Sequence, residues 1–168
     1  MIHSRKKITR LIPVSIALMV SLSLLSTQHL GAQVDLDETD ERAVAVINQF
    51  MEALMSGDFD SSAKAVLPFV HASLQTADRS SMDQDTLNYQ FKKAQANAQF
   101  YRVPVQITRV QELRTTEIGH PSRGNYQKGT ERKYWIAKKE GQAGLPAPLV
   151  VFFPEDGGQP TISYMGSL

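Results

Sequence analysis

The sequence predicts an α+β fold in which three N-terminal helices pack on a strongly curved antiparallel sheet. Apolar residues recur every three or four positions between residues 40 and 98, which is the helical period. After Gln99 they alternate with polar residues, and a glycine-containing turn separates two further strand-like runs near the C-terminus. Helices followed by a run of strands indicate helices packed on one face of a sheet.

The first 32 residues predict a secretory signal peptide. Four basic residues precede the apolar run Leu11–Leu25, and the polar stretch Ser26–Ala32 follows. The run is shorter than the roughly 20 apolar residues that span a bilayer, so we expect cleavage after Ala32 and a periplasmic or secreted protein. A chain tethered to the membrane by an uncleaved signal anchor is the alternative.

Composition narrows the class of protein further. The chain has 168 residues, a net charge of +1 and no cysteine, which fits a single domain without disulfides or thiolate metal sites. Residues 33–168 carry 14 basic and 17 acidic side chains, a net charge of −3, which disfavours nucleic-acid binding. Residues 33–88 carry about −8 and residues 89–168 about +5. This asymmetry fits a polarised surface that attracts an anionic ligand. The alternative is that acidic residues are simply favoured at helix starts.

Residues 33–39 are expected to form a flexible acidic leader, and residues 40–168 a single domain. The first helix is expected from Asp40, capped by Thr39 or Asp40 and ended by Gly57. Its buried stripe is Val44, Ile47, Met51, Leu54 and Met55.

Two shorter helices are expected next. Asp60 is the predicted cap of the second, which should end near Pro68 because proline lacks a backbone donor. Residues 70–75 alternate and predict a short strand. Asp83 or Asp85 is expected to cap the third helix, whose buried side is Leu87, Phe91, Ala94 and Ala98.

The C-terminal half predicts a strand meander. The expected strands span residues 101–107, 133–139, 149–153 and 161–165. A bulge is expected at Thr108–Arg109 because the alternation changes phase there, and residues 119–129 are expected to be a loop. The positions expected to face the interior are all apolar: Val103, Val105, Ile107, Ile136, Val151 and Phe153.

The segment Ala45–Leu74 resembles the opening of the nuclear transport factor 2-like superfamily, a cystatin-like α+β cone, in an exported bacterial member. The shared features are a first helix ending at Gly57-Asp58 and a Pro68-Phe69-Val70-His71 run that leads into a first strand. The resemblance implies a bent sheet with a pocket at its open end, and a homodimer through the sheet. Other helix-on-sheet folds are the alternatives.

His71 is the candidate for acid–base chemistry, with Asp58 as its partner. Enzymes of the resembling fold pair such groups in a pocket, whereas a lone histidine is usually a hydrogen-bonded structural group. His120 is expected to be solvated. Because these two histidines are far apart in the sequence, no metal site and no cofactor are predicted.

Aromatic residues on the predicted strands are the candidate ligand contacts. They could ring a pocket and stack on an apolar ligand, while Arg109 or Arg132 meets its carboxylate; the alternative is that they are ordinary residues of a half-exposed sheet. The candidates are Tyr101, Tyr134, Trp135 and Tyr164.

These features predict an exported, non-enzymatic domain that binds a small apolar or anionic ligand or another protein, and that does not contact the membrane once the signal is cleaved. The absence of an inward-facing aspartate on any predicted strand argues for this function. The alternatives are a pocket enzyme (an isomerase, dehydratase or hydrolase acting on a small apolar molecule) and a structural accessory of an envelope assembly.

Overall fold

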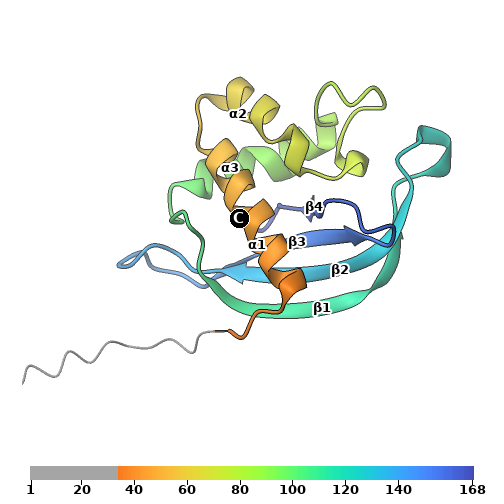
Figure 1. Ribbon diagram of the computed structural model, residues 1–168. Helices are drawn as coiled ribbons and strands as arrows, with labels where there is room; N and C mark the ends of the chain where they lie inside the picture. Colours follow the sequence, from red (N-terminus) through yellow and green to blue (C-terminus); the bar gives the residue numbers. More distant parts are fainter. Residues whose placement is uncertain (1–33) are drawn as a thin grey trace, which may run out of the picture.

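The computed structural model describes residues 34–168, so the predicted signal peptide and its cleavage site lie outside the described residues. Three α-helices precede a four-stranded antiparallel sheet of order β1-β2-β3-β4 (Figure 1). This confirms the α+β class and the packing of the first helix on the sheet. The sheet is open, and the finer assignment to the nuclear transport factor 2-like cone stays a prediction.

Helix α1 (Glu38–Leu54) begins two residues earlier than expected. Its N-cap is Asp37 rather than Thr39 or Asp40. The Asp37 carboxylate accepts from the Asp40 backbone N at 2.7 Å, and the Asp40 carboxylate accepts from the Asp37 backbone N at 3.3 Å. This reciprocal capping box satisfies backbone donors that a helix start leaves free, so the end of the expected leader is helical.

Helix α2 (Phe59–Ala65) also starts earlier, because Asp58 and not Asp60 is its cap and accepts from the Ser61 backbone N at 2.8 Å. The helix ends before Pro68, which lies in the short 3-10 helix η1 (Leu67–Phe69). The prediction of a strand at residues 70–75 is wrong. Val70 makes one isolated bridge to Ile162, and a second 3-10 helix, η2 (Ala72–Leu74), follows.

The third expected helix is composite. The π-helix η3 (Thr86–Phe91) runs directly into α3 (Lys92–Ala98). Asp83, one of the two residues expected to cap this helix, accepts from the Thr86 backbone N at 2.9 Å and from the Thr86 hydroxyl at 2.8 Å. Three of the predicted apolar side chains on this segment are buried, which confirms the helical face: Phe91, Ala94 and Ala98.

Strand β1 (Ile107–Ile118) starts six residues later than expected. Pro104 has no backbone donor, and the Val105 backbone N donates to the Asn48 side chain at 2.7 Å, so the preceding residues do not pair as a strand. A register shift between Ile107 and Arg109 confirms the expected bulge.

The remaining strands are β2 (Gln127–Ile136), β3 (Ala147–Pro154) and β4 (Thr161–Tyr164). β2 begins inside the expected loop 119–129, which contains the 3-10 helix η4 (Pro121–Arg123). The pairing of β3 with β4 confirms the C-terminal hairpin.

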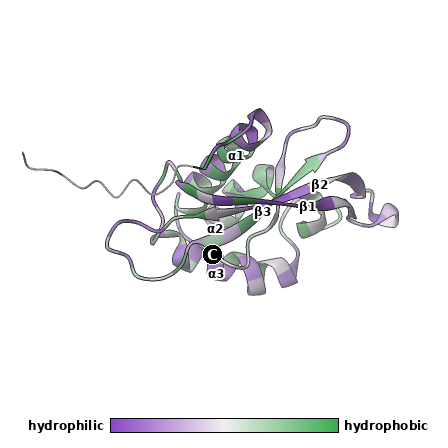
Figure 2. Ribbon diagram, turned by 90° about the horizontal axis from the view of Figure 1, so that it is seen from below, coloured by the Kyte–Doolittle hydropathy of each residue, from purple (hydrophilic) through white to green (hydrophobic). Residues whose placement is uncertain are grey.

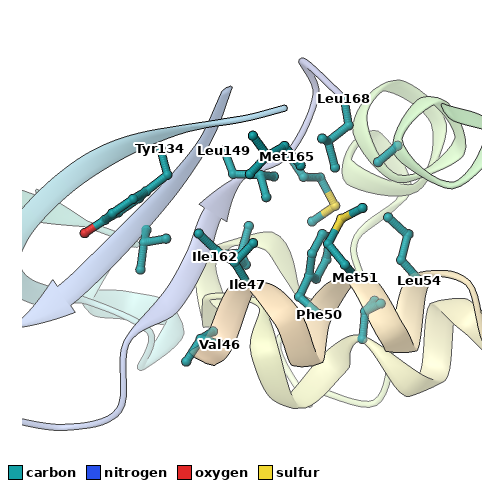
Figure 3. Close-up of a cluster of buried hydrophobic side chains, with 14 of the residues drawn as sticks. Val46, Ile47, Phe50, Met51, Leu54, Tyr134, Leu149, Ile162, Met165 and Leu168 are labelled. Atoms are coloured by element: carbon teal, nitrogen blue, oxygen red, sulfur yellow. The ribbon is translucent and has the colours of Figure 1, made fainter. Parts of the chain in front are cut away.

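The core lies between α1 and the sheet. Figure 3 shows one face of α1 directed at β3, β4 and the C-terminal residues. The buried contacts between them are made by Ile47, Phe50, Met51, Leu54, Leu149, Ile162, Met165 and Leu168. Of the six positions expected to face the interior, Ile107, Ile136 and Val151 are buried, and Val103, Val105 and Phe153 are half-buried.

Side chains alternate between two faces of the sheet. We call the face toward α1 the inner face; it includes Tyr134 and its cross-strand partner Leu149. The outer face includes the neighbouring residues Trp135 and Val150. Figure 2 shows hydrophilic colour along the edge strand β1, whose residues are mostly exposed. Within residues 34–168, no helix is both long and apolar enough to cross a membrane.

Candidate functional site

The most buried charged cluster lies where the first turn of α1 meets β2. Arg132 donates to Asp40 at 2.8 Å and to both carboxylate oxygens of Asp37 at 3.0 and 3.1 Å. The Tyr134 hydroxyl donates to Asp40 at 2.7 Å. The two-residue period of β2 places Arg132 and Tyr134 on the inner face, and the capping box places both aspartates opposite them.

The surroundings of this cluster keep its phenol protonated. Burial and the hydrogen bond to Asp40 raise the pKa of Tyr134 far above its ordinary value. Burial opposes the charge of Arg132, but the bonds to Asp40 and Asp37 outweigh it and raise the pKa of the guanidinium. The Asp40 backbone N–H and Arg132 lower the pKa of Asp37. Tyr134 therefore cannot act as a base, and Arg132 remains charged and held in place.

A polar cavity of about 320 Å³ lies beside this cluster on the inner face. Arg132 forms part of its wall, and Glu112 approaches Arg132 at 3.7 Å. The other side chains that line it include Thr39, Thr115, Thr130, Phe153 and Glu155. From the sequence, Asp40 is expected only at the start of the helix. Its pairing with Tyr134 is not visible there, since the pairing depends on which face of α1 meets β2.

His71 is buried, with 1% of its surface exposed. Its Nδ1 accepts from the Ser73 backbone N at 3.0 Å, and Nε2 lies 2.9 Å from Gln127 Oε1, so Nε2 carries the proton. Burial lowers the pKa of His71, and the bond to Gln127 opposes this only in part. The structure does not bring His71 and Asp58 together: among the described residues neither bonds to the other, and Asp58 caps α2.

The two histidines of the described chain share a local motif. His120 Nδ1 accepts from the Ser122 backbone N at 3.3 Å and caps η4, as His71 caps η2 through Ser73. Asn125 joins the two turns, because its side chain accepts from the His120 backbone N at 2.7 Å and donates to the Ala72 carbonyl at 3.4 Å. His-x-Ser is therefore a capping signal in this chain, and both imidazoles have structural partners.

The five residues expected to ring one pocket lie in separate places. Tyr134 faces α1, whereas Trp135 is on the outer face, where the Arg109 guanidinium stacks 4.4 Å from the indole centroid. Tyr164 is exposed in β4, and Tyr101 is buried at an isolated bridge to Lys138. Burial raises the pKa of Tyr101. The structure therefore does not bring these candidates together around one pocket; Tyr134 and Trp135, as adjacent strand residues, point to opposite faces.

A second cavity of about 320 Å³, which we call the α2 cavity, lies between α2, η1 and η3. Its wall is mainly apolar, and Phe59, which is 37% exposed, stands at its edge with its ring 5.1 Å from that of Phe91. Asp60 and Lys64 provide charges beside the apolar wall. The lining side chains include Phe59, Ala63, Leu67, Met82 and Leu87.

The loop that borders the α2 cavity is held by Asp78. Its carboxylate accepts from the Thr76 hydroxyl at 2.7 Å and from the Ser80 hydroxyl and backbone N at 2.8 and 3.1 Å, which lowers the pKa of Asp78 to about 2. Arg79 adopts a positive φ of 57°, rare for a residue other than glycine. Such strained positions and π-helices such as η3 are frequent at functional sites.

Among residues 34–168, no group of three or more acidic or histidine side chains could hold a metal ion. Comparisons with family models, with curated proteins and with solved structures find no match for this chain. The geometry of the site alone therefore carries the functional argument, and the resemblance to the nuclear transport factor 2-like superfamily stays a prediction.

Proposed function

We propose that this chain is an exported, non-enzymatic domain that binds a small apolar molecule in the α2 cavity. The observation that carries the proposal is the apolar wall of this cavity, made by Phe59, Leu67 and Leu87. Ligand pockets are typically concave, mostly apolar and about 300 Å³ or larger. At about 320 Å³, the cavity is about twice the ~150 Å³ that holds benzene in an engineered core.

The hydrogen bonding of the buried polar groups supports binding rather than catalysis. Acid–base catalysis needs a group that exchanges a proton with the substrate at working pH. Asp40 accepts from both Arg132 and Tyr134, and both nitrogens of His71 have partners. None of these four side chains lines the α2 cavity. A ligand there would be selected by shape and apolar contact, with Lys64 or Asp60 offering one polar contact.

The buried Asp40–Tyr134 pair is the observation that favours the alternative, a pocket enzyme with a carboxylate and a phenol next to the polar cavity. Against it, the raised pKa of Tyr134 holds the phenol protonated, and Arg132 holds Asp40 in an ion pair. The pair therefore serves to anchor α1 on the sheet.

The proposal is tested by titrating the protein with the fluorescent probe 1-anilinonaphthalene-8-sulfonate. Its naphthalene ring suits the apolar wall, and its sulfonate suits Lys64. We expect saturable binding by the wild type and at least about tenfold weaker binding by Ala63→Phe, whose ring would occupy the cavity. Ala96→Phe makes the same change on the exposed side of α3 and should bind like wild type. Equal binding by all three folded proteins would exclude this site.

A further inference from the structure

The end of the molecule formed by the β2–β3 loop presents one apolar side chain. Leu145 is 86% exposed, more than any other large hydrophobic residue in the described chain. Its loop is fixed: Lys138 Nζ donates to the Ala143 carbonyl at 3.0 Å, and Gly144 beside it has a φ of +112°. A Cβ at residue 144 would lie 2.5 Å from Lys138 Nζ. The backbone therefore holds Leu145 in water at a loop tip.

Basic residues lie at this end of the sheet. Lys138 and Lys139 begin the loop, Arg102 lies on the adjoining segment, and Arg109 stacks on Trp135 where β2 ends. Asp35 and Glu140 oppose these four cations. The Leu145 end thus has an excess of positive charge.

Trp135 and Phe100 lie at the same end, and both are half-buried. The Lys138 ammonium lies 5.9 Å from the Phe100 ring centroid. Tryptophan is typical of surfaces that sit at the headgroup level of a bilayer.

The chain also enters the fold at this end. Val34, the first described residue, shares a groove with Arg102 and Gln106, and the Gln106 carbonyl accepts from the Ala137 backbone N at 2.8 Å. Figures 1 and 2 place the β2–β3 loop at one end of the sheet and the β1–β2 loop at the other.

In place of the expectation from the sequence that the domain does not contact the membrane once the signal is cleaved, we propose that this end docks on an anionic phospholipid surface, with Leu145 inserted at the boundary of the acyl chains and the four cations over the headgroups. Neither element alone binds firmly, but an apolar insertion and a basic patch act together. A second copy of the chain or an acidic protein fits the tip less well. One protruding leucine on a charged loop offers little of the area that a stable protein interface buries.

The test uses the absence of cysteine from the chain. Leu145→Cys gives a unique site for an environment-sensitive nitrobenzoxadiazole label, and Ser122→Cys gives the matched site on the β1–β2 loop. The chain recovered after export is mixed with vesicles of phosphatidylcholine alone or of equal parts phosphatidylcholine and phosphatidylglycerol. We expect a blue shift and brighter fluorescence at residue 145 only, with the anionic vesicles only, and a weaker response as salt is added.

Charge reversal tests the basic patch. A basic residue near an anionic surface contributes about fivefold in affinity, so Arg102→Glu combined with Lys139→Glu should weaken the response by at least about twentyfold. Arg123→Glu, at the opposite end, should leave it unchanged. The proposal would be overturned by the absence of a fluorescence response at residue 145, or by an equal response with neutral vesicles or at residue 122. It would also be overturned by a response that rises with protein concentration in the absence of lipid. All substituted positions are exposed or half-exposed, and circular dichroism checks that each variant is folded.

Discussion

Substituting Tyr134→Phe removes one hydroxyl from the contact between α1 and β2 without leaving a large void. That hydroxyl donates at 2.7 Å to Asp40, which is 5% exposed, and the Tyr134 side chain is fully buried. A hydrogen bond to a charged group contributes about 1.5–3 kcal/mol. Because Arg132 still donates to Asp40, we expect a loss near the middle of that range, about 2 kcal/mol.

Urea unfolding followed by circular dichroism measures this loss, with the slope of the transition unchanged if only the native contact is lost. At about 4 °C per kcal/mol for a domain of this size, the melting temperature should fall by about 8 °C. Tyr126→Phe is the matched control. It also removes a tyrosine hydroxyl bonded to a carboxylate, that of Glu117, but on the exposed β1–β2 hairpin, so the midpoint should not move.

A double-mutant cycle with Asp40→Asn separates the hydrogen bond from other effects of the substitution. If the hydroxyl and carboxylate act as one unit, the two losses should be non-additive by about 1 kcal/mol or more. A change of less than about 0.5 kcal/mol for Tyr134→Phe, or additive losses in the cycle, would refute the view that this pair anchors α1.

Two further predictions concern stability. Because burial lowers the pKa of folded His71 below the roughly 6.5 of an unfolded histidine, the unfolded chain takes up the proton first. The free energy of unfolding should therefore be highest above about pH 6.5 and fall as the pH drops below it. His71→Asn, which keeps an acceptor for Ser73, should flatten this pH dependence in urea titrations. An unchanged pH dependence in the variant would contradict the assignment. Gly129→Ala places a Cβ 2.0 Å from the Phe153 carbonyl oxygen and should cost about 3 kcal/mol or more. Gly57→Ala, whose Cβ would meet only the Ser61 side chain at 3.1 Å, should cost less, and equal melting temperatures would refute this argument.

The helical and strand classes of most segments could be predicted from the sequence because they follow from local periodicity. The buried face of η3 and α3 and the bulge after Ile107 both appear where the pattern places them. The starts of α1 and α2 differ from the prediction because more than one aspartate near each start could serve as the cap. The structure uses Asp37 instead of the expected Thr39 or Asp40, and Asp58 instead of the expected Asp60. Asp37 is the cap of α1 since its partner Asp40 can bond back to it.

The site could be predicted less well, because it depends on contacts between distant elements. Tyr134 and Trp135 are neighbours in the sequence, yet they lie on opposite faces of β2. The α2 cavity depends on how Phe59 and Leu87, 28 residues apart, pack around Met82. The strand expected from residue 101 starts only at Ile107 for a related reason, since Val105 bonds to Asn48 of α1 rather than to another strand.

The proposed function is tested most directly by a crystal structure of the chain purified from the cells that make it. We predict electron density for a small apolar molecule in the α2 cavity, in contact with Phe59 and Leu87 and with any polar group directed at Lys64. A cavity closed by its own side chains, or a ligand bound instead beside Arg132 in the polar cavity, would contradict the proposal.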